Sequence, residues 1–142
     1  MEFKKEEQIS KKGENYEPVE ILTFDDIGLK DNLLRGIFSY GYEKPSIIQT
    51  KAIHPLINKY DIIAQAQSGT GKTATFTIGV LQRIDENINQ TQAIILAHTR
   101  ELAQQIKTVV THLSSYLNIN VCLSVGGTNL RDNIDELNNN PH

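Results

Sequence analysis

The stretch that most constrains the fold is AQSGTGKTAT, residues 66–75. It follows a short apolar run, DIIAQ, and leads into GKTATFTIGVLQRI, whose apolar residues recur at helical spacing. The closely spaced glycines permit a tight turn, because glycine adopts positive φ without a steric penalty. A strand, a glycine-rich turn and a helix in this order predict the opening unit of an α/β domain.

The same stretch fits the phosphate-binding pattern G-x-x-x-x-G-K-[ST], except that Ala66 stands at the first glycine. Backbone N–H groups from Ser68 to Gly71, placed at a helix N-terminus, can form a nest for phosphate oxygens. We expect Lys72 to contact the β- and γ-phosphates and Thr73 to bind Mg²⁺ through its hydroxyl. The alternative is a glycine-rich connection that binds no ligand.

The rest of the chain continues the alternation of strands and helices. Helices are expected over residues 29–40, 45–60, 71–84, 100–117 and 129–138, and buried strands over 61–66, 92–97 and 120–125. We expect Gly41 to end the first helix and Pro55 to kink or break the second. This order predicts an α/β domain with a parallel sheet flanked by helices.

Composition excludes several classes of protein. The 142 residues suffice for one domain, and the formal net charge of −3 argues against a generic basic nucleic-acid binder. No apolar run approaches the ~18 residues of a membrane span. The single cysteine, Cys122, cannot form an internal disulfide, and its apolar surroundings favour a small buried residue. Residues 1–20 are charged and lack apolar periodicity, which predicts a disordered tail.

A candidate adenine-recognition segment precedes the glycine-rich turn. In GYEKPSIIQ, residues 41–49, the amide of Gln49 can both donate and accept, which matches the N6 and N7 edge of adenine but not guanine. Phe24 lies upstream and its ring could stack on a base. The alternatives are a surface position for Gln49 and a core position for Phe24.

Two further segments carry groups suited to a sugar-phosphate backbone. Thr99 and Arg100 fall where a predicted strand ends and a helix opens, and ligands bind at that edge of open α/β sheets. The alternatives are a helix cap and a structural ion pair. Gly126 and Gly127 end the third predicted strand, where a plain turn is the alternative. None of the four histidines, at positions 54, 98, 112 and 142, has metal-ligand partners at a suitable spacing.

Together these segments resemble the DEAD-box family of ATP-dependent RNA helicases. Phe24 with residues 41–49 looks like the family's Q motif, residues 66–73 like motif I, 98–103 like motif Ia and 126–127 like the GG motif. In that family motif I begins with alanine, which accounts for Ala66. The resemblance implies that residues 21–142 form the N-terminal part of a RecA-like domain, a P-loop fold.

The resemblance also implies a function. ATP and Mg²⁺ would be the cofactors, Lys72 and Thr73 would serve catalysis, and RNA would be bound through its backbone, without sequence specificity and without a preference for DNA. The implied nucleotide-binding residues are Phe24, Tyr42, Lys44, Gln49, Ser68, Gly69, Thr70, Gly71, Lys72, Thr73 and Ala74, with Thr73 at the metal and Thr99, Arg100 and Gly127 at the RNA.

The flanking sequence is most similar to the translation-initiation branch of the family. That branch implies a cytoplasmic protein with scaffold partners in translation initiation. The alternatives are nuclear relatives of the exon junction or ribosome biogenesis, another P-loop ATPase or kinase, and a non-catalytic nucleotide-binding scaffold.

The sequence departs from the family pattern in two respects. His98 stands where motif Ia has proline, and the sequence contains no D-E-A-D, S-A-T or T-P-G-R. We therefore expect the 142-residue chain alone to show essentially no ATP turnover, because phosphoryl transfer depends on positioned acidic groups and metal. We also expect a sheet without its last strands to leave an unpaired edge that promotes self-association.

Overall fold

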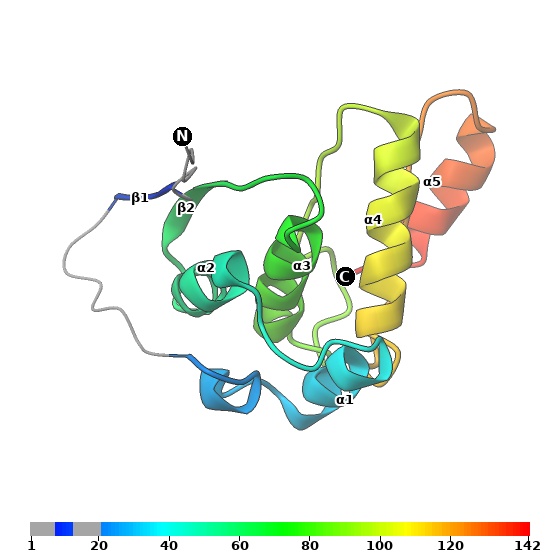
Figure 1. The fold of residues 1–142 in the computed structure, drawn as a ribbon. Coiled ribbons are helices and arrows are strands. Elements are labelled where there is room, and N and C mark those ends of the chain that lie inside the picture. Colours follow the sequence, from blue (N-terminus) through cyan, green and yellow to red (C-terminus); the bar gives the residue numbers. More distant parts are fainter. Residues whose placement is uncertain (1–7, 13–20) are drawn as a thin grey trace.

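A computed structural model describes residues 8–12 and 21–142 of the chain (Figure 1). The elements in order are β1 (Gln8–Lys12), the 3-10 helix η1 (Asp25–Ile27), α1 (Asp31–Ser39), α2 (Ile47–Ile57), β2 (Asp61–Gln65), α3 (Lys72–Arg83), α4 (Arg100–Leu113) and α5 (Leu130–Asn138). All five helices expected from the sequence are present, with shorter bounds than predicted at several ends.

The core gathers around α3, which packs against α2 on one side and α4 on the other, while α1 contacts both α3 and α4 (Figure 1). Each helix has one apolar face, and packing these faces against one another removes them from water. The fully enclosed side chains include Phe24, Leu33, Ile37, Ile53, Ile78, Leu81 and Leu113. This helical core positions the loops that precede α3 and α4.

Gly36 sets the crossing of α1 and α4. A Cβ atom at this position would lie 2.1 Å from the backbone oxygen of Leu113. The two helices therefore approach at a distance that only glycine permits, which explains a glycine in the middle of α1 despite its low helix propensity.

Pro55 does not break the second helix, contrary to the expectation that it kinks or ends there. Helix α2 continues to Ile57, and the Asn58 N–H donates to the His54 carbonyl at 3.2 Å. Pro55 is buried in the packing of the domain. Tertiary packing therefore outweighs the hydrogen bond that proline cannot donate.

The strands differ most from the prediction. Within the described residues the sheet has two strands, β1 and β2, which pair antiparallel with Gln8 opposite Gln65 and Lys12 opposite Asp61. Residues 8–12 thus form a strand where a disordered tail was expected, and the remainder of that segment lies outside the described residues. Strand β2 was expected to be buried, but the side chain of Ile63 is 74% exposed.

Residues 92–97 and 121–125 are extended but do not form ladders. Ala93, Ile95 and Ala97 pack against the core, whereas Ile94 and Leu96 are 79% and 89% exposed. This alternation is the period-two pattern of a strand. The prediction of two more paired strands is therefore wrong for the structure as it stands, because neither segment has a hydrogen-bonded neighbour strand in the described part of the chain.

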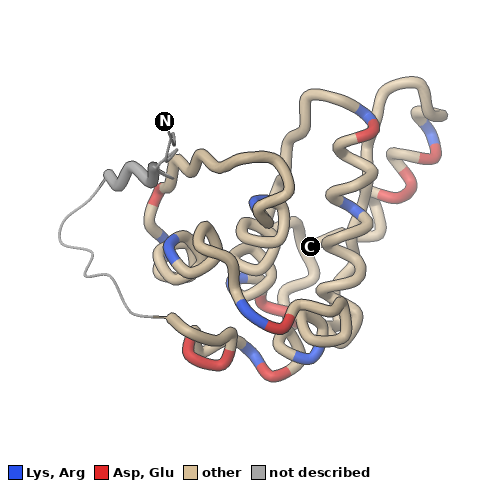
Figure 2. The backbone as a smooth tube through the Cα atoms, in the orientation of Figure 1, with Lys and Arg blue, Asp and Glu red and all other residues tan. Residues whose placement is uncertain are grey.

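Charged residues of both signs are interspersed along the described backbone (Figure 2). Neither sign dominates a whole face of the tube in this view, in keeping with the net charge of −3. Across the described residues, no helix combines the length and apolar character needed to cross a membrane.

Candidate nucleotide site

The loop between β2 and α3 has the conformation that a phosphate nest requires. Gly69 and Gly71 adopt φ values of +80° and +98°, which are accessible to glycine without strain. Gly71 is the N-cap of α3, and the first intrahelical bond is donated by the Thr75 N–H to the Gly71 carbonyl at 3.0 Å. The N–H groups of residues 72–74 thus lie at the positive end of the helix, where anions bind.

The ammonium of Lys72 lies over the loop itself. Its Nζ donates to the carbonyl oxygens of Ala66 and Gln67, both at 2.6 Å. The hydroxyl of Thr70 also donates to the Gln67 carbonyl, at 2.8 Å. These bonds hold the cation above the nest, where phosphate oxygens could replace the two carbonyls as its partners.

Gln49 lies directly against this loop. Its side chain is 3% exposed, and its Oε1 accepts a hydrogen bond from the Ser46 N–H at 2.8 Å. A Cβ atom on Gly71 would lie 2.8 Å from Gln49 Nε2. The bond from Ser46 fixes the orientation of the amide, because it assigns the oxygen to one side and the NH₂ group to the side facing the loop. The carbonyl oxygen retains a second lone pair for a ligand.

Other predicted nucleotide-binding residues are placed less favourably. Phe24 is 0% exposed, with its ring packed edge-on against Phe38 at 6.4 Å between centroids. The prediction that Phe24 stacks on a base is wrong for this conformation, because core packing covers both faces of its ring. Tyr42 is half-buried beside Tyr40, and burial, with a smaller contribution from Tyr40, raises the pKa of its phenol. Lys44 is exposed.

Thr73 and Ala74 complete the first turn of α3. Ala74 is buried, so only its N–H can serve a phosphate. Thr73 is half-buried and can offer one hydroxyl oxygen. Such an oxygen suits Mg²⁺, which takes one or two protein ligands and completes its shell with phosphates and water. The residues present therefore fit a nucleotide-bound Mg²⁺.

The three predicted RNA-contacting residues come together at a second loop edge. Thr99 is the N-cap of α4, and its Oγ1 accepts from the Leu102 N–H at 3.2 Å. A Cβ atom on Gly127 would lie 2.8 Å from Arg100 Nη2, so the guanidinium packs on the backbone of that glycine. Gly127 has a φ of +84°. The loops that open α3, α4 and α5 all lie along the upper side of the molecule in Figure 1.

His98 does not disturb this edge. Thr99 keeps an extended backbone, with φ −133° and ψ 156°, and retains its capping bond. The histidine side chain is exposed. A proline is therefore not needed at this position to place Thr99 and Arg100.

Two contacts of the candidate site were missed from the sequence. The role of Ser46 in orienting Gln49 follows from the capping pattern S-x-x-Q in SIIQ, a signal that the sequence contains. The role of the Ala66 and Gln67 carbonyls in holding Lys72 has no sequence signal, because a backbone oxygen is common to all residues.

Comparison with known proteins identifies the family. The profile of the DEAD/DEAH box helicase family matches residues 46–142. The chain belongs to the DEAD/DEAH box helicase family. The ATP-dependent RNA helicases eIF4A of Meyerozyma guilliermondii and Debaryomyces hansenii are 60% and 61% identical to it over 121 residues, which cover 85% of this chain and 30% of each relative.

Solved structures of this family share the fold. A DEAD box protein from Methanococcus jannaschii matches with a TM-score of 0.82 and 39% identity, covering 87% of this chain and 34% of that one. The RNA helicase Prp28 from Chaetomium thermophilum bound to ADP matches with a TM-score of 0.78 and 36% identity, covering 92% and 33%. The predicted fold class, a RecA-like α/β domain, is confirmed by these neighbours. The chain spans about 30% of the length of the curated relatives that it matches.

Proposed function

We propose that this chain is the nucleotide-binding part of an ATP-dependent RNA helicase that acts in translation initiation. The observation that carries the proposal is the contact between Gln49 and Gly71, which joins an adenine-recognising amide to a phosphate loop. A site in which neighbouring groups contact both the base and the phosphates binds a purine nucleotide in one orientation.

Each group has a defined task in this proposal. The Gln49 amide accepts from the adenine N6-amino group and donates to N7. Lys72 leaves the Ala66 and Gln67 carbonyls and contacts the β- and γ-phosphates, while Thr73 holds Mg²⁺, which neutralises phosphate charge during transfer. The N–H groups at the start of α3 bind the remaining phosphate oxygens.

The RNA would lie along the edge formed by Thr99, Arg100 and Gly127. A guanidinium and free backbone groups at a helix N-terminus suit phosphate oxygens, which carry no sequence information. Binding at this edge is therefore sequence-independent. Because the net charge is −3, such binding depends on individual cationic and polar groups at this edge rather than on an overall positive charge.

The role in translation initiation rests on the similarity to the eIF4A relatives, including 59% identity to the Candida albicans protein over 121 residues. The proposed partners are RNA and scaffold proteins of translation initiation, and the proposed location is the cytoplasm. We expect no ATP turnover by the 142-residue chain alone, since its sequence lacks the D-E-A-D acids.

The proposal is tested by equilibrium binding of ATP, ADP and GTP in the presence of Mg²⁺. We expect adenine nucleotides to bind and GTP not to bind. Lys72→Ala should weaken ADP binding by ~10–100-fold, because a hydrogen bond to a charged group contributes ~1.5–3 kcal/mol. Lys51→Ala, an exposed lysine on α2, is the matched control and should leave the affinity unchanged.

Gln49→Glu separates the structural and the recognition roles of this residue. Glutamate keeps the oxygen that accepts from the Ser46 N–H, so α2 retains its cap, but it cannot donate to adenine N7. We expect the preference for ADP over GDP to fall by about ten-fold or more. Equal binding of ADP and GDP by the unaltered, folded chain would refute adenine recognition.

A further inference from the structure

The place where α1 meets the end of α4 gathers exposed aromatic side chains. Phe38, Tyr40 and Tyr116 are 45%, 38% and 41% exposed, whereas the other phenylalanine and tyrosine side chains that the structure describes are buried or half-buried. All three belong to α1 or to the turns directly after α1 and α4. There α1 lies under the lower end of α4 (Figure 1). Exposed apolar groups that cluster in this way mark interaction surfaces, whereas scattered ones do not.

Two contacts between side chains flank the close crossing of α1 and α4. On one side of the crossing, the guanidinium carbon of Arg35 lies 4.5 Å from the centre of the Tyr116 ring. On the other side, the Tyr40 ring lies 5.5 Å from the ring of His112 and 5.0 Å from that of Tyr42. These side chains are therefore held in position before a ligand arrives, which lowers the entropic cost of binding.

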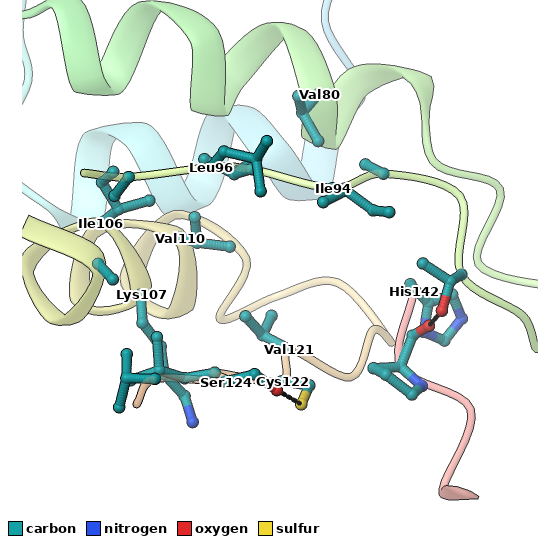
Figure 3. Close-up of a pocket in the computed structure, with 18 of the residues that line it drawn as sticks. Val80, Ile94, Leu96, Ile106, Lys107, Val110, Val121, Cys122, Ser124 and His142 are labelled. Carbon is teal, nitrogen blue, oxygen red and sulfur yellow. Dashed lines mark hydrogen bonds between the residues drawn. The ribbon is translucent and has the colours of Figure 1, made fainter. Parts of the chain in front are cut away.

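This junction is separate from the side of α4 that faces the extended segments. Ile106 and Val110 line the cleft between segments 92–97 and 121–125 (Figure 3). His112 follows Val110 by two positions in α4, which is a rotation of about 200° around the helix axis. The exposed ring of His112 therefore lies on the opposite side of α4 from that cleft.

The junction offers one unpaired cation. Within the described part of the chain Arg35 forms no ion pair and donates no hydrogen bond. Neither residues 32–42 nor residues 102–118 contain aspartate or glutamate, and Lys107, their only lysine, is paired with Glu136 at 3.6 Å. A free guanidinium binds one carboxylate through two parallel hydrogen bonds. A nucleic-acid strand requires several cations, so the charge favours an acidic side chain.

The aromatic groups also carry unused hydrogen-bonding atoms. Among residues 21–142, none forms a hydrogen bond with the hydroxyl of Tyr40 or of Tyr116. His112 Nδ1 lies 2.7 Å from the Thr108 carbonyl oxygen, so Nδ1 carries the ring proton and Nε2 remains an acceptor. These atoms suit the N–H and C=O groups of an extended peptide, because the backbone of a helix is already paired internally.

We propose that the α1–α4 junction, formed by Arg35, Tyr40, His112 and Tyr116, binds an extended segment of a partner protein in which an acidic residue lies two positions from an apolar one. The carboxylate pairs with Arg35, and the apolar side chain packs on the rings of Tyr40 and His112. Arg35 and Tyr40 are separated by about 7.5 Å along α1. Alternate side chains of an extended chain share one side at about 6.6 Å, which matches this separation.

The test is an NMR titration of the 142-residue chain with the peptide Ser-Gly-Ser-Glu-Thr-Leu-Ser-Gly-Ser, capped at both ends. We expect saturable shifts of the amides of Arg35, Tyr40, His112 and Tyr116, with a dissociation constant of about 1 mM or below, and no shifts in residues 66–75. One control peptide has Gln in place of Glu, and another exchanges Glu and Thr. Each should bind about ten-fold more weakly, because the carboxylate is absent or lies on the other side of the peptide.

Two arginine variants locate the contact on the protein. Arg35→Gln removes the charge of an exposed side chain at the junction, and Arg131→Gln does the same on α5, outside it. We expect the first to weaken peptide binding by about ten-fold and the second to leave it unchanged, with an unaltered spectrum of α3 as evidence of folding. Equal binding by Arg35→Gln, or no saturation by the folded chain, overturns the proposal. If a short oligouridylate binds, and Arg35→Gln abolishes this binding whereas Thr99→Ala does not, the junction is an RNA site and the proposal is also overturned.

Discussion

The phosphate loop and the cleft between segments 92–97 and 121–125 differ in where their hydrogen bonds come from. The loop satisfies its polar groups within a few residues, as Lys72 does with the carbonyls of Ala66 and Gln67. Segment 92–97 alternates between packed and exposed side chains, but both extended segments need partner strands from elsewhere in the chain or from another molecule. Local geometry therefore suffices for the first region and is insufficient for the second.

The two regions also differ in how completely their apolar side chains are buried. Helix α3, which begins at the phosphate loop, is fixed by side chains that are enclosed on all sides. Segment 92–97 buries only one of its two apolar faces, since Ala93, Ile95 and Ala97 pack against the core while Ile94 and Leu96 are exposed. The same substitution should consequently change the free energy of unfolding by very different amounts in the two regions.

The largest expected effect comes from a matched pair of isoleucines. Ile78→Ala removes a side chain that is 0% exposed in α3 and should lower the free energy of unfolding by ~2–5 kcal/mol. Ile94→Ala removes one that is 79% exposed and should change it by less than about 0.5 kcal/mol. Urea denaturation measures both values. Similar losses for the two variants would show that residues 92–97 are packed in solution.

A smaller effect is expected where segment 92–97 meets helix α4. Thr99→Ala removes the side chain that accepts from the Leu102 N–H and should cost ~0.5–2 kcal/mol of unfolding free energy. Thr99→Ser keeps the hydroxyl and should cost little. If serine and alanine destabilise equally in thermal or urea unfolding, the cap does not hold the start of α4 and another contact must.

The smallest effect concerns a purely local cluster. Hydrogen bonds from the backbone and side chain of Thr23, followed by the Leu22 N–H, hold the pKa of Asp26 below its ordinary value of 3.8. A carboxylate with a lowered folded-state pKa contributes stability above its unfolded pKa and loses it as the pH falls through the folded value. The melting temperature of the chain should therefore fall slightly more between pH 5 and about pH 3 than that of Asp26→Asn. Parallel curves for the two proteins would contradict this local contribution.

Most of the helices and the phosphate loop could be predicted from sequence, because their signals are short-range. The turn at Gly69 and Gly71 and the N-cap at Thr99 require particular residue types within a few positions. Phe24 shows the limit of such reasoning. An aromatic residue at a motif position is suited both to stacking on a base and to packing in a core. In the structure Phe24 packs against Phe38 and is fully buried in the core.

Pro55 and residues 92–97 also show that tertiary structure can overrule a local sequence signal. Sequence alone favoured a broken helix at the first and a paired strand at the second, yet the helix continues and the strand is unpaired. Burial of α2 against α3 compensates for a missing backbone bond, whereas an extended segment cannot make its ladder without a neighbour. The family, the phosphate loop and the helix order were thus determined by sequence, since each depends on nearby residues. Which strands pair, which ring is buried and where an open cleft lies were decided by tertiary structure, because those outcomes depend on contacts between segments far apart along the chain.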